Sequence, residues 1–138
     1  MNGNDHQRAL IDTNVVIHLS ALDGSQLPDE MVISAVTLAE LSAGPHHADD
    51  AAERARRISV LQHAETTFDP LPFDAEAARA FGLISAAVLA AGRKPRRRIA
   101  DLMIAAVACA SRLPLYTTNP GDFAGLDGML TIVPVKRP

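Results

Sequence analysis

Four acidic residues of this 138-residue chain stand in largely apolar stretches, where an ionised carboxylate is costly unless its charge is compensated. They are Asp12, Glu40, Asp101 and Asp122. Carboxylate oxygens are preferred ligands of hard divalent cations such as Mg²⁺ and Mn²⁺. If the fold gathers these side chains, they form a metal site. In phosphodiester hydrolysis such an ion polarises the phosphoryl oxygen and lowers the pKa of bound water.

Each acid also has an ordinary structural explanation. Asp12 can cap a following helix, and Thr37-Leu38-Ala39-Glu40 fits a capping box. Asp101 fits the first turn of a helix, where the helix dipole favours an acid. Asp122, in a Pro-Gly-Asp sequence, fits a turn. The joint pattern, rather than any single acid, favours the metal site.

The composition describes one well-packed domain, residues 1–138. Apolar residues make up 48% of the chain and the mean hydropathy is +0.09, which favours a globular protein over disorder. A net charge of −3 gives no overall indication of nucleic-acid binding. The single Cys109 cannot form an internal disulfide, and no charge-free apolar stretch approaches the roughly 20 residues of a membrane helix. We therefore expect a cytoplasmic protein without membrane contact.

Strand patterns alternate with helix patterns along the chain. The expected strands are 8–12, 31–34, 68–73, 115–118 and 131–135, and the expected helices are 14–22, 36–43, 49–63, 75–91 and 98–112. The two prolines in 68–73 indicate an edge or irregular strand. Helix 36–43 should stop at Gly44-Pro45, and Asp74 should cap helix 75–91. This alternation predicts an α/β sandwich with a mostly parallel central sheet.

In such sheets a ligand binds beyond the carboxyl ends of the strands. Asp12 lies at that end of the first expected strand, and Asn119 and Asp122 follow strand 115–118. Asp101 opens the helix that leads into that strand, and Glu40 follows the second strand. We therefore expect the acids to converge at one edge of the sheet.

Four segments resemble the signatures of PIN domains, especially those of VapC-type toxins of bacterial toxin–antitoxin pairs. They are residues 10–16 (LIDTNVV), 37–41 (TLAEL), 99–106 (IADLMIAA) and 117–123 (TTNPGDF), in the family's order. The first and third are fairly specific, the second is weak by itself, and together they span nearly the whole chain. The resemblance implies a three-layer α/β/α fold.

The resemblance also implies an activity and partners. Family members are endoribonucleases in which acids bind Mg²⁺ or Mn²⁺ and a metal-activated water cleaves RNA. The expected substrate is thus a tRNA, rRNA or mRNA, and the expected protein partners are a cognate antitoxin and a second copy of the chain.

Carried over by position, Asp12 and Asp101 would ligate the metal directly, and Glu40 would ligate it or orient the attacking water. Thr13 and Asn14 would shape the site, and Thr118 would offer a hydrogen bond to an acid. Many relatives have Asp where Asn119 stands here. We expect Asp122 to be the fourth acid and Asn119 a supporting ligand, which leaves the number of metal ions, one or two, open.

A basic segment directly precedes Asp101. Its cations are Arg93, Lys94, Arg96, Arg97 and Arg98. Most such runs are solvated loops, but this one adjoins the expected site, and arginine suits phosphate by its bidentate geometry. We expect it to bind the RNA backbone.

Other features have simpler explanations. His46 and His47 fit a structural loop rather than a zinc site. The arginines of helix 49–63, which are Arg54, Arg56 and Arg57, fit a solvated face, with partner contact as the alternative. The apolar positions Phe81, Leu83, Ile84 and Val88 fit the core first, and a dimer or antitoxin surface second.

Two other functions stay open. A phosphatase of the haloacid dehalogenase kind also begins with a strand and an Asp, but it needs a second acid where Asn14 stands. A non-catalytic, partner-binding α/β domain would use the acids only for folding or ion affinity, and would show no metal-dependent cleavage.

Overall fold

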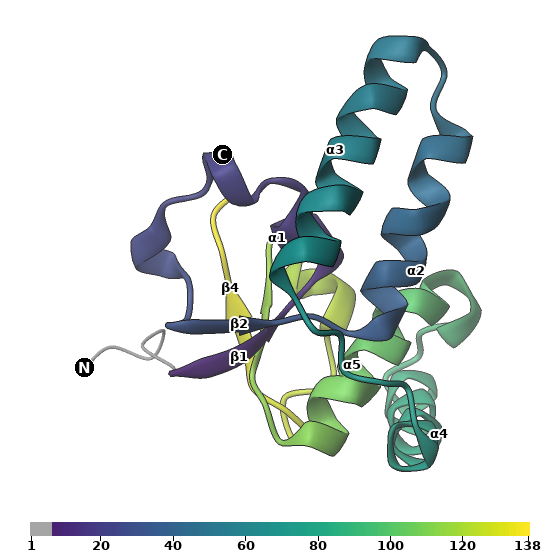
Figure 1. Cartoon of the computed structure of the whole chain (residues 1–138). Helices are drawn as coiled ribbons and strands as arrows, with labels where there is room; N and C mark the ends of the chain where they lie inside the picture. The colour runs from purple at the N-terminus through teal and green to yellow at the C-terminus, as the bar shows by residue number, and fades with distance from the viewer. Residues whose placement is uncertain (1–6) are drawn as a thin grey trace.

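A computed structural model describes residues 7–138, so the first six residues of the expected domain lie outside it. Within that range the strands are β1 (Arg8–Ile11), β2 (Glu30–Val32), β3 (Leu115–Thr117) and β4 (Ile132–Pro134). They form one sheet in the order β2-β1-β3-β4 (Figure 1). Every pairing in it is parallel, so the predicted parallel sheet is confirmed.

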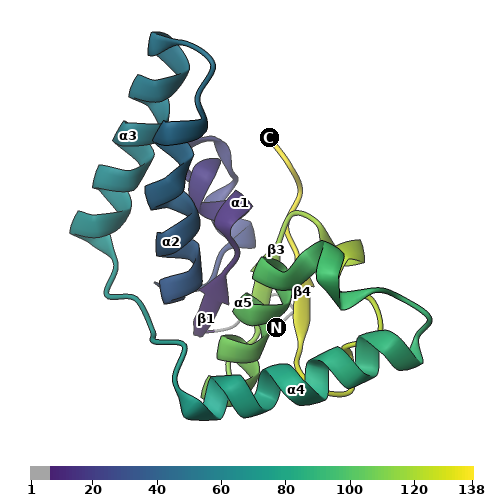
Figure 2. The same ribbon diagram turned by 90° about the vertical axis from the view of Figure 1, so that its right-hand side faces the viewer.

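The helices cover both faces of the sheet. They are α1 (Thr13–Ile17), α2 (Ala35–Ala43), α3 (Ala51–Thr67), α4 (Ala75–Ala90) and α5 (Ile99–Ser111). Figure 2 shows the α2–α3 pair on one side of the sheet and α4 with α5 on the other. This is the expected α/β/α arrangement.

Alternation along the strands explains the two layers. Leu10 and Leu115 pair in register and join the core that faces α4 and α5. Their neighbours Ile11 and Tyr116 also pair in register but join the core that faces α1, α2 and α3. Successive side chains of a strand point to opposite faces, so each strand supplies both cores. The apolar α5 lies centrally, as its sequence predicts.

The expected helix 14–22 is wrong in its second half. Helix α1 ends at Ile17, and a 3₁₀ turn, η1 (Leu19–Ala21), follows it. The run Val15-Val16-Ile17 is β-branched, and such residues lose side-chain freedom in a helix, which disfavours a longer one.

The expected strand 68–73 is also wrong. Within this segment only Leu71 forms a β-bridge, a single parallel pairing with Ser34, which follows β2 in the chain. Its N–H donates to the Ile33 carbonyl at 2.9 Å, and its own carbonyl accepts from the Ala35 N–H at 2.8 Å. Pro70 and Pro72 on either side carry no N–H, so the ladder cannot extend beyond this bridge.

The connection from α4 to α5 carries the basic segment. Gly92 follows α4 with φ +77°, a left-handed conformation that ends the helix and favours glycine. The chain then forms a 3₁₀ turn, η4 (Pro95–Arg98), that runs directly into α5. Among residues 7–138, no helix combines the length and the apolar character that crossing a bilayer requires.

Candidate active site

The acids lie at the carboxyl edge of the sheet, as expected. Asp12 follows β1, Asp101 is in the first turn of α5, and Glu40 is in α2. These three side chains line one cavity of about 600 Å³, together with Thr13 and Asn14 among others. Asp122 lies in a 3₁₀ turn after β3, η5 (Pro120–Phe123), and its charge is close enough to raise the pKa of both Asp12 and Asp101.

Asp12 is the most buried of the four, with 2% of its surface exposed. Its Oδ1 accepts the Thr13 N–H at 2.7 Å, and its Oδ2 accepts the Thr117 hydroxyl at 2.8 Å. Burial raises the pKa of Asp12, and these two hydrogen bonds oppose the rise. Asp12 therefore caps α1, as one of its interpretations predicts, and also belongs to the acid cluster, while its role as a metal ligand stays a prediction.

The surroundings of Asp101 raise its pKa strongly. Burial first, and then the charges of Asp12, Asp122 and Glu40, raise its pKa to about 6. Arg98 opposes this rise. The shift shows that the fold places the Asp101 carboxyl in a partly desolvated position among other acids, an arrangement typical of functional sites.

Glu40 is held by a chain of hydroxyl groups. The Thr13 hydroxyl donates to Glu40 Oε1 at 2.7 Å and lies 3.0 Å from the Thr37 hydroxyl. A hydroxyl donates only once, so Thr37 must donate to Thr13. The Ser34 hydroxyl donates to Thr37 at 3.4 Å. Ser34, Thr37 and Thr13 are all buried, so this chain is a fixed support for the carboxylate.

The capping box expected from Thr37 to Glu40 is wrong. Helix α2 begins earlier, and its N-cap is Ser34, whose hydroxyl accepts the Thr37 N–H at 3.0 Å. Glu40 is therefore two turns into the helix and reaches across to Thr13 instead of back to a backbone amide. The spacing of three from Ser34 to Thr37 to Glu40, which puts all three on one helix face, is the signal that sequence reasoning missed.

Thr118 does not make the hydrogen bond expected of it. The donor to Asp12 is Thr117, the neighbouring residue. Because Ile11 pairs with Tyr116, the next residues, Asp12 and Thr117, lie side by side on the same face. Thr118 is buried, but as the next residue after Thr117 its side chain points to the opposite face, away from Asp12.

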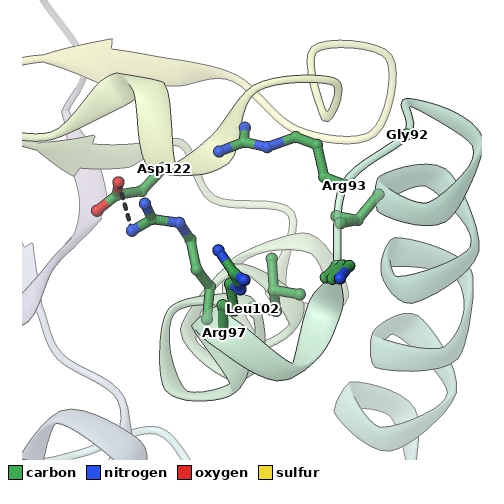
Figure 3. A pocket seen from close by; sticks show the side chains of 8 residues that line it. Gly92, Arg93, Arg97, Leu102 and Asp122 are labelled. Carbon is green, nitrogen blue, oxygen red and sulfur yellow. Dashed lines mark ion pairs between the residues drawn. The ribbon is translucent and has the colours of Figure 1, made fainter.

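The fourth acid is engaged by an arginine. Asp122 Oδ1 lies 2.6 Å from Arg98 Nη1, the ion pair drawn in Figure 3, and Arg98 Nη1 also lies 3.9 Å from Asp101 Oδ2. The Asn119 side-chain oxygen accepts a hydrogen bond from Arg137.

A second cavity, of about 410 Å³, lies beside the acid cluster. Four cations of the basic segment, Arg93, Lys94, Arg97 and Arg98, line it with Asp122. Figure 3 shows the labelled Arg93, Arg97, Leu102 and Asp122 around this cavity. Arg93 also donates to the Gly121 carbonyl at 2.9 Å, which ties the segment to η5. Arg96 is exposed and does not line this cavity.

Two arginines of α3 also border the acids. Arg56 and Arg57 line the larger cavity, and both pair with Glu53. Arg57 further donates to the Gly44 carbonyl at 2.8 Å. Only the packing of α3 against α2 brings these residues to the site, so no local sequence signal identifies them as site residues.

The donor set suits a hard cation. Mg²⁺ is commonly bound by one or two carboxylates plus waters and substrate phosphates. Within residues 7–138 no three His, Cys, Asp or Glu side chains are spaced to hold one ion together. Asp12 and Asp101 both present oxygen atoms to one cavity, and the charge of Asp12 contributes, after burial, to the raised pKa of Asp101, so these residues fit an ion that takes few carboxylates. His46 and His47 form no such group either.

Comparisons with known proteins agree with this geometry. The PIN domain family matches residues 9–128. Ribonuclease VapC5 of Mycobacterium tuberculosis is 37% identical over 126 residues, which cover 89% of this chain and 90% of that protein. Ribonuclease VapC4 of the same organism is 36% identical over 123 residues, covering 87% and 92%.

Solved structures of VapBC proteins have a similar fold. The toxin–antitoxin structure VapBC-5 from Mycobacterium tuberculosis contains a chain with a TM-score of 0.81 and 35% identity, covering 94% of this chain and 98% of that one. A chain of VapBC2 from Rickettsia felis, bound to a DNA fragment from its promoter, has a TM-score of 0.70 at 19% identity, covering 94% and 99%. At this identity the Rickettsia felis structure supports the fold alone.

Proposed function

This chain belongs to the PIN-domain family, and we propose that it is a VapC-type endoribonuclease, the toxin of a toxin–antitoxin pair. One observation of the site carries the proposal. Asp12 and Asp101 come from distant parts of the chain, lie in one cavity, and each has a pKa raised by burial and by neighbouring acids. The fold therefore concentrates negative charge where a cation-dependent phosphodiesterase needs it.

Asp12 and Asp101 would hold Mg²⁺ or Mn²⁺. Glu40 is not spaced with them to share one ion, so it would orient the attacking water. When bound, the ion would supply Lewis-acid activation of the phosphoryl group and of a water molecule. Two hydrogen bonds fix the orientation of the Asp12 carboxylate, one from Thr13 and one from Thr117.

The chain of hydroxyl groups orients the Glu40 carboxylate, so that one of its oxygens can bind the attacking water. Thr13 donates to Oε1, so this oxygen is fixed, while among residues 7–138 no side chain or main-chain group donates to Oε2. Glu40 Oε2 accepts a hydrogen bond from the attacking water and orients its lone pair toward phosphorus. Thr37 and Ser34 act only by holding Thr13 in place.

The basic cavity binds the RNA backbone. Its cations lie next to Asp122, so a phosphate held there stays beside the acid cluster. Arg56 and Arg57 border the acids from α3 and offer positive charge at the larger cavity. Contacts to phosphate give affinity without sequence preference.

The expected protein partner is an antitoxin. The similar VapBC-5 structure is that of a toxin–antitoxin system. On α4, Ile84 and Val88 are buried as expected and Phe81 is partly buried, but Leu83 is 66% exposed, so its expected core position is wrong. Leu89 is 61% exposed on the same helix. Single exposed apolar side chains are common on protein surfaces, so these two do not by themselves indicate a partner. A homodimer remains a prediction.

The test is RNA cleavage by the chain after removal of any antitoxin. Defined tRNA and rRNA fragments are incubated with Mn²⁺ or with EDTA. We expect cleavage by the wild type in Mn²⁺, and its loss in EDTA and in Asp101→Asn. The matched control is Asp127→Asn, which changes an exposed acid outside the site and should cleave normally. Equal cleavage by Asp101→Asn, or cleavage that persists in EDTA, would reject the mechanism. No cleavage by the wild type in Mn²⁺ would leave the partner-binding domain as the better description.

A further inference from the structure

Arg98 occupies the part of the acid cluster nearest Asp122. Its Nη1 lies 2.6 Å from Asp122 Oδ1 and 3.9 Å from Asp101 Oδ2. The shorter distance is that of a charge-assisted hydrogen bond. One guanidinium therefore contacts two acids that come from different elements, α5 and η5.

Neighbouring contacts hold Arg98 in this position. It is the residue that leads into α5, three positions before Asp101, so its side chain starts beside that acid. On the other side, the Arg93 hydrogen bond to the Gly121 carbonyl ties the basic segment to the turn that carries Asp122.

The remaining oxygen donor near Asp122 is also engaged by a guanidinium. The side-chain oxygen of Asn119 accepts from Arg137, and its amide carries no charge. A two-metal site needs ligands for two ions about 3.5–4 Å apart. The residues beyond Asp12, Glu40 and Asp101 that would serve a second ion, Asp122 and Asn119, both hold arginines instead.

We infer that Arg98 takes the place of a second metal ion, so that this active site holds one divalent cation. The inference rests on the proposed function, since it concerns the cation of that site. Arg98 is a positioning residue here: it neutralises Asp122 and thereby removes it from the set of metal ligands.

The position of Arg98 also suits it to the substrate. Its side chain lines the basic cavity together with Arg97 and Lys94, and it is 42% exposed there. A guanidinium can pair with a carboxylate and with a phosphate through different N–H groups. Arg98 therefore presents fixed positive charge to RNA at the side of the cluster where a second ion would otherwise lie.

The test counts Mn²⁺ ions bound per chain by electron paramagnetic resonance, on the full chain without RNA. We expect one ion for the wild type and two for Arg98→Gln, because this change frees Asp122. Arg98→Lys keeps the positive charge and should bind one. The matched control, Arg96→Gln, removes a charge of the same segment outside the cavity and should also bind one. The thermal unfolding of each variant confirms that it is folded.

The outcomes separate this inference from the proposed function. Two ions on the wild type, none on the wild type, or one on a folded Arg98→Gln chain would each overturn the role of Arg98. RNA cleavage by a wild type that binds two ions would keep the ribonuclease and reject the inference. If the wild type binds one ion, Arg98→Gln binds two and the wild type cleaves no RNA, the role of Arg98 is kept and the ribonuclease is rejected.

Discussion

The Thr13 hydroxyl donates a 2.7 Å hydrogen bond to Glu40 Oε1, across the space between α1 and α2. Thr13 also supplies the backbone N–H that binds Asp12 Oδ1. One residue therefore orients two of the four acids, one through its main chain and one through its side chain.

Removal of the Thr13 hydroxyl should slow cleavage more than it weakens RNA binding. Thr13→Val keeps the N–H to Asp12 but leaves Glu40 without its donor. A hydrogen bond to a charged group is worth about 1.5–3 kcal/mol, so we expect kcat to fall about 10- to 100-fold with little change in KM. Steady-state cleavage of a short RNA measures both constants.

Thr13→Ser is the control for this change, since it restores the hydroxyl and should restore most of kcat. A Thr13→Val enzyme with wild-type kcat would show that Glu40 needs no such support. A rise in KM alone would place Thr13 in RNA binding instead.

Neutralising Asp101 should stabilise the chain when no metal is present. The folded state raises the pKa of Asp101 from its ordinary value of 3.8 to about 6, so folding favours the protonated form. Above pH 6 the charged form persists in the fold at a cost of about 1–3 kcal/mol, which Asp101→Asn removes. We therefore expect Asp101→Asn to be the more stable protein in urea unfolding at pH 7.5 in EDTA.

The difference in unfolding free energy between Asp101→Asn and the wild type should depend on pH. As pH falls through about 6, the folded wild type takes up a proton at Asp101 before the unfolded chain does, so its stability rises. The advantage of Asp101→Asn should then shrink between pH 6 and pH 4. Asp127→Asn serves as the control and should show no such advantage. A constant difference at every pH would assign the effect to something other than this charge.

A divalent cation should stabilise the wild type and not Asp101→Asn. Binding to the folded state alone adds about 2.7 kcal/mol when the ligand stands at 100 times its Kd. We expect Mn²⁺ or Mg²⁺ to raise the Tm of the wild type by several degrees, and EDTA to reverse the rise. A scan of Tm against metal concentration for both proteins is the measurement. An equal rise in Asp101→Asn would locate the stabilising ion elsewhere.

An arginine that lines the basic cavity should contribute more to RNA binding than an arginine of the same segment that lies outside it. Arg97 lines the basic cavity and Arg96 does not. We expect Arg97→Gln to weaken binding more than Arg96→Gln, and to lower the slope of log K against log salt by about 0.7 for one lost phosphate contact on single-stranded RNA. Fluorescence anisotropy in EDTA, where cleavage is absent, gives both quantities. Equal losses would favour a diffuse basic surface over a defined cavity.

The sequence predicts the position of Asp12 and Asp101 because both depend on local signals. An apolar strand followed by an acid, and an acid at the start of an apolar helix, place the two side chains at the same edge of a parallel sheet. The cap Asp74 follows from the same kind of signal, and it accepts the Ala77 N–H as predicted. The expected helix 49–63 begins later, at Ala51, because Asp50 is its cap and accepts the Glu53 N–H.

The errors arise where one residue of register or a distant contact decides the outcome. The choice between Thr117 and Thr118 depends on how β3 aligns with β1, which no local pattern records. Arg56 and Arg57 reach the site only through the packing of α3 on α2. The arginine pairs of Asp122 and Asn119 also need the fold, because Arg98 and Arg137 lie on opposite sides of them in the sequence.

The bridge at Leu71 has a consequence for the α2–α3 pair. The chain departs from the sheet at Ile33, runs out along α2 and back along α3, and is fastened to its point of departure by the two Leu71 hydrogen bonds. The pair is thus a lobe closed at its base, and Glu40 lies between that base and the far turn. Changes of length at the far turn, near the exposed Asp49, leave the base where it is. The outer end of the lobe can therefore change in length and sequence while its base stays fastened beside the sheet edge that carries Asp12.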